Sequence, residues 1–202
     1  MPLAFAITFD YLCPFARNLN EHVITALEGG ADWDVTFTPY SLTQGHLTED
    51  DEPVWDRPDP DRASGIFALQ VGLAVRDHFR NRFLAAHREL FAARHDRGED
   101  LKDRDVVAKA LDAAGLDPDE VFAAVADGAF LAVLRDEHRR NVELHGIWGV
   151  PTVIAGDRAV FVRLLDRPDG DVARSRDRIE RVVTLVTDFP DLHEFKQVDL
   201  PF

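Results

Sequence analysis

The sequence is almost devoid of cysteine, because Cys13 is the only one among 202 residues. A single cysteine excludes a disulfide within the chain and nearly excludes a zinc site built from the cysteines of one chain. Basic residues are also scarce, 23 against 37 acidic ones, which gives a net charge of −14. Nucleic acids and anionic membrane surfaces attract basic patches. We therefore expect no nucleic-acid partner and no membrane partner.

Long apolar runs are missing as well. No stretch of about 18 or more apolar residues occurs, so we expect no membrane-spanning helix. The first ten residues lack the basic start of a signal peptide, which leads us to expect a cytoplasmic location. A chain of this length buries roughly 70% of its unfolded surface, so it needs no disulfide or metal to fold.

The beginning of the chain has a strand–helix–strand pattern. An apolar run at 3–9 predicts a buried strand, and Pro14 suits the first turn of a helix that continues to residue 27. Alternating apolar and polar residues at 33–38 predict a second strand. A connection of this kind is right-handed and makes the two strands parallel.

Helical patterns fill the middle of the chain and strand patterns return near its end. After a polar loop at 41–61, residues 63–145 are predicted to be helical throughout, with one long helix or two short ones before residue 95. Asp103 and Asp117 are predicted to cap the starts of two further helices in this stretch. Strands at 150–155 and 159–162, joined by a hairpin turn, precede a last amphipathic helix at 171–188.

This order of elements predicts an α/β fold with a four-stranded mixed sheet, β-α-β followed by β-β-α. We assign the sheet domain to residues 1–40 and 147–202, and an inserted helical domain to residues 41–146.

The pair Cys13-Pro14 lies where the first strand passes into the first helix. A thiol at a helix N-terminus faces unpaired amides and the positive end of the helix dipole, which both favour the thiolate. We expect a lowered pKa for Cys13, with Arg17 one turn further adding positive charge. The alternative is that Cys13 is only a small buried apolar residue.

The segment Gly149-Val150-Pro151-Thr152 comes directly before the third strand. Proline is tolerated where a strand begins, so the segment is either an ordinary strand entry or a specific turn, and the isomer of the peptide bond before Pro151 stays open. Strand ends of neighbouring strands meet, so we expect Cys13 to face this segment. The backbone of Val150 could then pair with a thiol substrate as a strand would.

The stretch Cys13-Pro14-Phe15-Ala16, the later Val150-Pro151-Thr152 and the helical block between them resemble the DsbA family of the thioredoxin-like superfamily. More narrowly, several segments resemble the actinobacterial mycothiol-dependent nitroreductase group, namely residues 9–15, 35–37, 41–42, 111–116, 150–152, 189–191 and 194–196. The resemblance implies a thioredoxin-like sheet and a redox function.

One residue departs from the family pattern, because Ala16 stands where the second cysteine of Cys-x-x-Cys is usual. A dithiol enzyme resolves its mixed disulfide with that second thiol, and this chain cannot. We therefore expect a thiol oxidoreductase in which Cys13 is the nucleophile. The residues expected to bind its thiol substrate are Pro14, Phe15, Ala16, Val150, Pro151 and Thr152.

The resemblance implies a low-molecular-weight thiol, mycothiol or glutathione, as co-substrate, and a disulfide or electrophile as the second substrate. No tightly bound cofactor is expected. Two alternatives stay open. One is a thiol-dependent isomerase or transferase, similar to 2-hydroxychromene-2-carboxylate isomerases and kappa-class glutathione transferases, which use serine at the Cys13 position. The other is a family member without catalysis that binds a partner. The oligomeric state is open between monomer and homodimer.

Other chemical signals are weak. The eight histidines form no His-Glu-x-x-His pattern, and we expect most of them on or near the surface and no metal site. Tyr40, Trp55 and Trp148 fit either the walls of a cleft between sheet and helices or the core.

Overall fold

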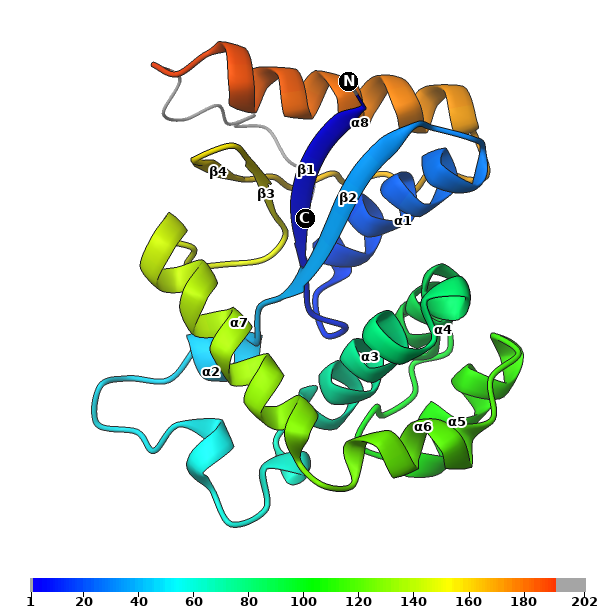
Figure 1. Ribbon diagram of the computed structural model, residues 1–202, viewed down its shortest axis with the longest axis vertical. Coiled ribbons are helices and arrows are strands. Elements are labelled where there is room, and N and C mark those ends of the chain that lie inside the picture. Colours follow the sequence, from blue (N-terminus) through cyan, green and yellow to red (C-terminus); the bar gives the residue numbers. More distant parts are fainter. Residues whose placement is uncertain (1, 192–202) are drawn as a thin grey trace.

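The computed structural model describes residues 2–191. Its four strands form one sheet in the order β2-β1-β3-β4 (Figure 1). They are β1 (Leu3–Phe9), β2 (Trp33–Pro39), β3 (Thr152–Ala155) and β4 (Arg158–Phe161). β1 and β2 are parallel, and the other two pairs are antiparallel. The predicted α/β fold with a mixed four-stranded sheet is therefore confirmed.

Two helices pack beside the sheet, α1 (Pro14–Glu28) and α8 (Val172–Asp188), and they also contact each other. Figure 1 shows them with the sheet in the upper half of the molecule. Along β1 the large apolar side chains alternate, so that Phe5, Ile7 and Phe9 lie on the same face. Burial of such apolar side chains is the main force that holds a helix against a sheet.

The remaining helices lie between β2 and β3 in sequence and fill the lower half of Figure 1. They are α2 (Leu42–Gly45), α3 (Ile66–His78), α4 (Phe83–His95), α5 (Arg104–Ala113), α6 (Pro118–Val125) and α7 (Ala129–His145). The sequence left open whether one long helix or two short ones precede residue 95. The structure has two, separated by the turn Arg80–Arg82. The predicted loop 41–61 contains the short α2 and the single-turn helix Val54–Asp56, and a further single turn, Pro60–Arg62, begins at its end.

Aspartate side chains fix several helix starts. The carboxylates of Asp103, Asp117 and Asp171 each accept a backbone N–H from the first turn of α5, α6 and α8, at 2.9 Å. Each bond satisfies one of the amides that a helix start leaves without a partner. The two starts predicted at Asp103 and Asp117 are therefore confirmed.

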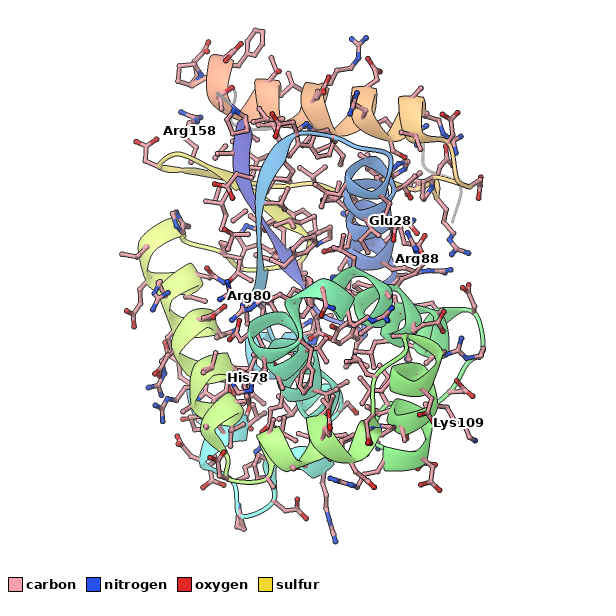
Figure 2. The ribbon with its side chains drawn as sticks, turned by 45° about the vertical axis from the view of Figure 1, so that its right-hand side comes forward. Glu28, His78, Arg80, Arg88, Lys109 and Arg158 are labelled. Atoms are coloured by element: carbon pink, nitrogen blue, oxygen red, sulfur yellow. The ribbon has the colours of Figure 1, made fainter. Side chains whose placement is uncertain are left out.

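A single hydrophobic core joins the sheet to the helices. His87 of α4 lies among the rings of Phe9, Tyr11 and Phe37, at centroid distances of 4.7 to 5.3 Å. Side chains fill the space between the sheet and the helices in Figure 2, where the labelled Glu28 of α1 and Arg88 of α4 meet at the edge. The division into a sheet domain and a helical domain stays a prediction.

Within residues 2–191, no helix combines the length and the apolar character needed to cross a membrane.

Candidate functional site

Cys13 is the N-cap of α1. The chain leaves β1 at Phe9 and turns so that the Cys13 amide donates to the Asp10 carbonyl at 3.1 Å. Pro14 follows as the first helical residue, where its missing N–H costs nothing. The amide of Ala16 then points at Cys13 Sγ from 3.4 Å. The thiol thus lies at the end of a helix, as the sequence predicts.

The other side of the sulfur is covered by the segment before β3. Cys13 Sγ donates a hydrogen bond to the Val150 carbonyl oxygen at 3.3 Å, and the Val150–Pro151 peptide bond is cis. Thr152 anchors this segment, because its amide donates to Thr8 Oγ1 at 2.7 Å and its hydroxyl donates to the Gly149 carbonyl at 2.8 Å. The structure therefore brings Cys13 and Val150 together. The roles of these residues in binding or catalysis stay predictions.

The electrostatic surroundings of Cys13 differ from the expectation. The amides of Ala16 and Phe15 lower the pKa of its thiol, but burial raises the pKa by more, since the residue is only 6% exposed. The net effect is a raised pKa. The expectation of a lowered pKa was therefore wrong, because burial disfavours the charged thiolate by more than the amides of the helix start favour it.

The cation near the thiol is also a different one. Arg17 is paired with Glu21 at 3.0 Å and with Asp96, and it does not act on Cys13. Arg163, two residues after β4, supplies the positive charge that lowers the pKa of Cys13. The sequence analysis considered only Arg17, one helix turn after Cys13, and missed Arg163, which is 150 positions away. The only signal was a basic residue directly after the predicted strand 159–162.

Asp10 is a second residue that sequence reasoning missed. It is fully buried, and its two carboxylate oxygens accept the backbone N–H groups of Leu12 at 2.8 Å and Leu42 at 2.7 Å. Burial raises the pKa of Asp10 to about 6. Its negative charge in turn raises the pKa of Cys13. An acid at the end of a buried strand, three residues before the thiol, was the available signal.

The three aromatic residues proposed for a cleft are not together. Tyr40 and Trp55 are buried and pack on His138, with centroid distances of 4.7 and 5.3 Å, so they belong to the core. Trp148 is 72% exposed and packs against Phe161, with the ring centroids 4.7 Å apart and the ring planes tilted by 37°. The core interpretation holds for the first two, and Trp148 belongs to the surface.

Three of the described histidines are buried, and the other four, His46, His78, His95 and His145, are exposed or partly buried, which agrees with the expectation for most of them. His22 bonds Ser175 Oγ at 3.0 Å, His87 bonds the Tyr11 hydroxyl at 2.8 Å, and His138 Nδ1 accepts the Ser41 amide at 3.1 Å. These contacts explain the three histidines as parts of the core. Within residues 2–191, no three His, Cys, Asp or Glu residues gather to hold a metal ion. His193 and the segment 194–196 lie outside the described residues.

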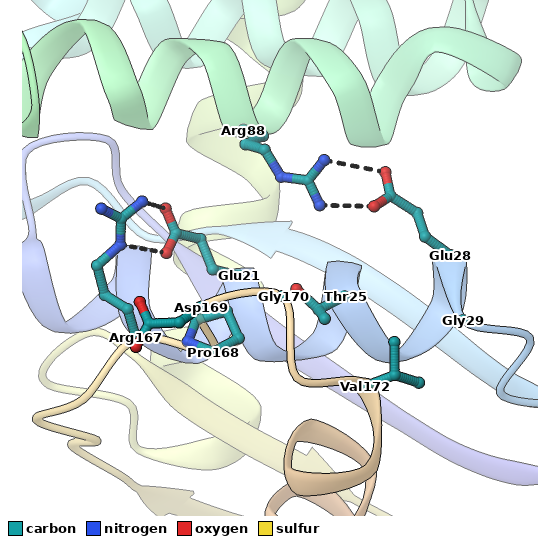
Figure 3. A pocket seen from close by; sticks show the side chains of 10 residues that line it. All are labelled: Glu21, Thr25, Glu28, Gly29, Arg88, Arg167, Pro168, Asp169, Gly170 and Val172. Atoms are coloured by element: carbon teal, nitrogen blue, oxygen red, sulfur yellow. Dashed lines mark hydrogen bonds and ion pairs between the residues drawn. The ribbon is translucent and has the colours of Figure 1, made fainter.

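A cavity of about 540 Å³ lies away from the thiol, beside the C-terminal half of α1 (Figure 3). Two ion pairs line the cavity, Arg167 with Glu21 at 2.8 Å and Arg88 with Glu28 at 2.7 Å. The carboxylates already occupy both guanidinium groups, and no residue of 10–17 or 148–153 lines the cavity. It therefore does not contribute to the site at Cys13.

Comparison with known proteins gives a consistent result. Residues 6–169 match the family described as DSBA-like thioredoxin domain. A probable DsbA oxidoreductase from Streptomyces coelicolor has a similar structure, with 17% identity, coverage of 98% of this chain and 94% of that chain, and a TM-score of 0.61. No curated protein matches the chain.

Two further solved structures have the same fold. The catalytic domain of Proteus mirabilis ScsC is 19% identical, covers 90% of this chain and 81% of that chain, and has a TM-score of 0.59. Oxidised BdbD from Bacillus subtilis is 13% identical. The match covers 90% of this chain and 87% of that chain, with a TM-score of 0.57. At these identities the likeness shows the thioredoxin-like fold, which the sequence predicts.

Proposed function

The chain belongs to the DSBA-like thioredoxin domain family, and on this premise we propose that it is a thiol oxidoreductase that works through Cys13 alone, with mycothiol or glutathione as co-substrate. The observation that carries the proposal is the contact of Cys13 Sγ with the Val150 carbonyl, 3.3 Å apart across the ends of β1 and β3. It puts the chain's one thiol next to a backbone acceptor that a substrate can use.

The raised pKa of Cys13 has a consequence for the order of events. Without substrate, the thiol keeps its proton and donates it to the Val150 carbonyl. A substrate whose N–H bonds that carbonyl takes the acceptor away from the thiol. The Ala16 amide remains directed at the sulfur and favours the thiolate. Substrate binding would thus promote loss of the thiol proton.

The chemistry that follows is two exchanges. The Cys13 thiolate attacks a substrate disulfide, one sulfur–sulfur bond forms and one breaks, and the second half of the substrate leaves as a thiolate. A free low-molecular-weight thiol, deprotonated by water, then attacks the mixed disulfide. Cys13 leaves as thiolate and regains its proton. The second thiol has to come from solution, because the sequence contains no other cysteine.

Mass spectrometry of the intact protein tests the proposal. After incubation with glutathione disulfide or mycothiol disulfide, the wild-type protein should carry one adduct, and the free thiol should remove it. Cys13→Ala should carry none, and this variant controls for non-covalent binding. Absence of an adduct under native conditions, together with adduct formation in denaturant, would show a buried thiol without catalytic function and favour a family member that only binds a partner.

A second candidate, a thiol-dependent isomerase or transferase, is favoured by one observation. Cys13 acts in this structure as a neutral group that donates one hydrogen bond and accepts another, and a serine hydroxyl can do the same. If Cys13→Ser keeps the turnover of an electrophilic substrate in the presence of glutathione or mycothiol, the bound thiol is the nucleophile. Loss of turnover in that variant favours the oxidoreductase.

We also propose a cytoplasmic location. The reducing conditions there would keep a solitary thiol free, and they supply the low-molecular-weight thiol that resolves its mixed disulfide. The choice of mycothiol rests on the resemblance of several segments to the mycothiol-dependent group and is decided by the same mass measurement with the two thiols in parallel.

A further inference from the structure

Four side chains form a continuous stack beside the thiol. The guanidinium carbon of Arg163 lies 5.2 Å from the ring centre of Phe15 and 5.4 Å from that of Phe161. The ring of Phe161 is in turn 4.7 Å from that of Trp148. We call Phe15, Arg163, Phe161 and Trp148 the arginine–aromatic stack. Three separate chain segments supply it, so its assembly depends on the fold.

The stack adjoins the candidate site on two sides. The Phe15 amide is one of the two that lower the pKa of Cys13, and the charge of Arg163 lowers that pKa as well. Gly149, next to Val150, packs against the Phe161 ring, since a Cβ there would lie 3.3 Å from it. A molecule on the stack is therefore in reach of both the sulfur and the Val150 carbonyl.

The charge of Arg163 is available to a ligand. The side chain is exposed, and within residues 2–191 it forms neither an ion pair nor a hydrogen bond, while its guanidinium lies over two aromatic rings. Aromatic faces fix a guanidinium by cation–π contact and leave its N–H edge free. That edge is suited to a carboxylate, which it can bind with two hydrogen bonds.

The aromatic part of the stack offers a second contact. Trp148 is 72% exposed and presents an indole ring to solvent, supported from behind by Phe161. A flat apolar group gains from stacking on such a ring. On a protein with a net charge of −14, a cation beside the thiol would favour the approach of an anion to the site.

We propose that the arginine–aromatic stack selects substrates that carry both an aromatic ring and a carboxylate, with Arg163 as the specificity-determining residue. The inference rests on the proposed function. In the reaction, Cys13 gives its proton to water and its thiolate attacks the bound aromatic disulfide. The new bond joins Cys13 Sγ to one aryl sulfur, and the other aryl thiolate leaves with its carboxylate. The substrate disulfide is reduced as Cys13 is oxidised to the mixed disulfide.

Two aromatic disulfides test the proposal, 5,5′-dithiobis(2-nitrobenzoate), which has a carboxylate on each ring, and the uncharged 2,2′-dithiodipyridine. The measured quantity is the ratio of their second-order rate constants with Cys13, from the absorbance of the released thiol. Arg163→Gln should lower this ratio at least about fivefold, and Arg163→Lys should lower it less. High salt should lower the wild-type ratio in the same direction.

A matched control lies on the same hairpin. Arg158→Gln makes the same change of charge at the other end of β4, where Figure 2 shows the labelled Arg158 near the hairpin turn, and it should leave the ratio unchanged. If both reagents react and Arg163→Gln leaves their ratio unchanged, the inference is overturned and the proposed function stands. If neither reagent modifies Cys13 in the native protein, the proposed function fails and the inference fails with it.

Discussion

The backbone N–H of Leu42 donates a 2.7 Å hydrogen bond to the buried carboxylate of Asp10. This bond connects the turn before Cys13 to the segment that follows β2. The Leu12 amide donates a hydrogen bond to the other carboxylate oxygen of Asp10 at 2.8 Å. Asp10 is therefore both an anchor for the thiol-bearing turn and a negative charge near the thiol. Both properties can be measured.

The first prediction concerns stability and pH. Burial raises the pKa of Asp10 from 3.8 to about 6, so between these values the folded protein binds more protons than the unfolded chain. The contribution of Asp10 is present at low pH and is lost as the pH rises through 6. Relative to Asp10→Asn, the wild-type free energy of unfolding should fall by about 3 kcal/mol between pH 3.5 and 7, measured by urea titration.

Asp34→Asn is the control for this measurement, because Asp34 is exposed on β2. That variant should follow the wild-type pH dependence. Parallel curves for wild type and Asp10→Asn would contradict the prediction.

The second prediction concerns the reactivity of Cys13. Because burial and Asp10 together raise the pKa of the thiol, iodoacetamide should alkylate the native protein with a midpoint above the ordinary cysteine value of about 8.5. Asp10→Asn should move that midpoint to lower pH, since the negative charge is removed. The same protein in denaturant gives the reference curve. A native midpoint below the denatured one would show that the helix start outweighs burial.

The third prediction concerns His87, which is fully buried and uncharged. Burial lowers its pKa from 6.5 to about 3, so the unfolded chain binds the proton more readily. The contribution of His87 to stability is present above pH 6.5 and is lost as the pH falls towards 3, by roughly 4 kcal/mol in all.

His87→Phe should flatten this acid limb of the stability curve, as urea titrations from pH 3 to 7 can show. It should also cost about 1–3 kcal/mol at pH 7, because the Tyr11 hydroxyl and the Asn20 side-chain oxygen lose their partner. An acid limb as steep as that of the wild type would mean that another group causes it.

Much of the fold could be predicted from the sequence, since it depends on local patterns. Alternation at 33–38 and the caps Asp103 and Asp117 act within a few residues, and the structure confirms them. The approach of Val150 to Cys13 was also accessible, because strand ends of one sheet meet. The direction in which the pKa of Cys13 shifts could not be predicted from the sequence, because the burial that raises it depends on the whole fold.

The same limit explains the choice of the wrong arginine. Distance along a helix made Arg17 the obvious cation, but Glu21 and Asp96 already bind it. Arg163 reaches the site through the hairpin. No local sequence pattern shows which of the two arginines pairs with a carboxylate among the described residues and which does not.

The fourth prediction concerns the packing of α1 against α8. Gly29 has φ −78°, which alanine can adopt, but an added Cβ would overlap the Val172 side chain. Gly29→Ala should therefore destabilise the protein by about 1–3 kcal/mol. Val172→Ala should relieve most of this cost in the double variant, which a double-mutant cycle of thermal or urea unfolding measures. Strict additivity of the two changes would show that the helices do not meet here.

The fifth prediction restores the second thiol. Ala16 follows Cys13 by three residues, and its amide points at the sulfur, so their side chains are neighbours. In Ala16→Cys, the introduced thiol should release a glutathione adduct from Cys13 without any added thiol and leave an intramolecular disulfide. Mass spectrometry distinguishes the two products. Ala16→Ser controls for the larger side chain, and its adduct should persist.

The residue that covers the sulfur is made late. Val150 follows Cys13 by 137 positions, so at ordinary translation rates the thiol is complete on the order of ten seconds before its cover. During that interval the nascent chain presents Cys13 uncovered. The Val150 carbonyl reaches the sulfur only once β3 has paired with β1. The thiol is therefore more open to oxidants on the nascent chain than in the folded protein.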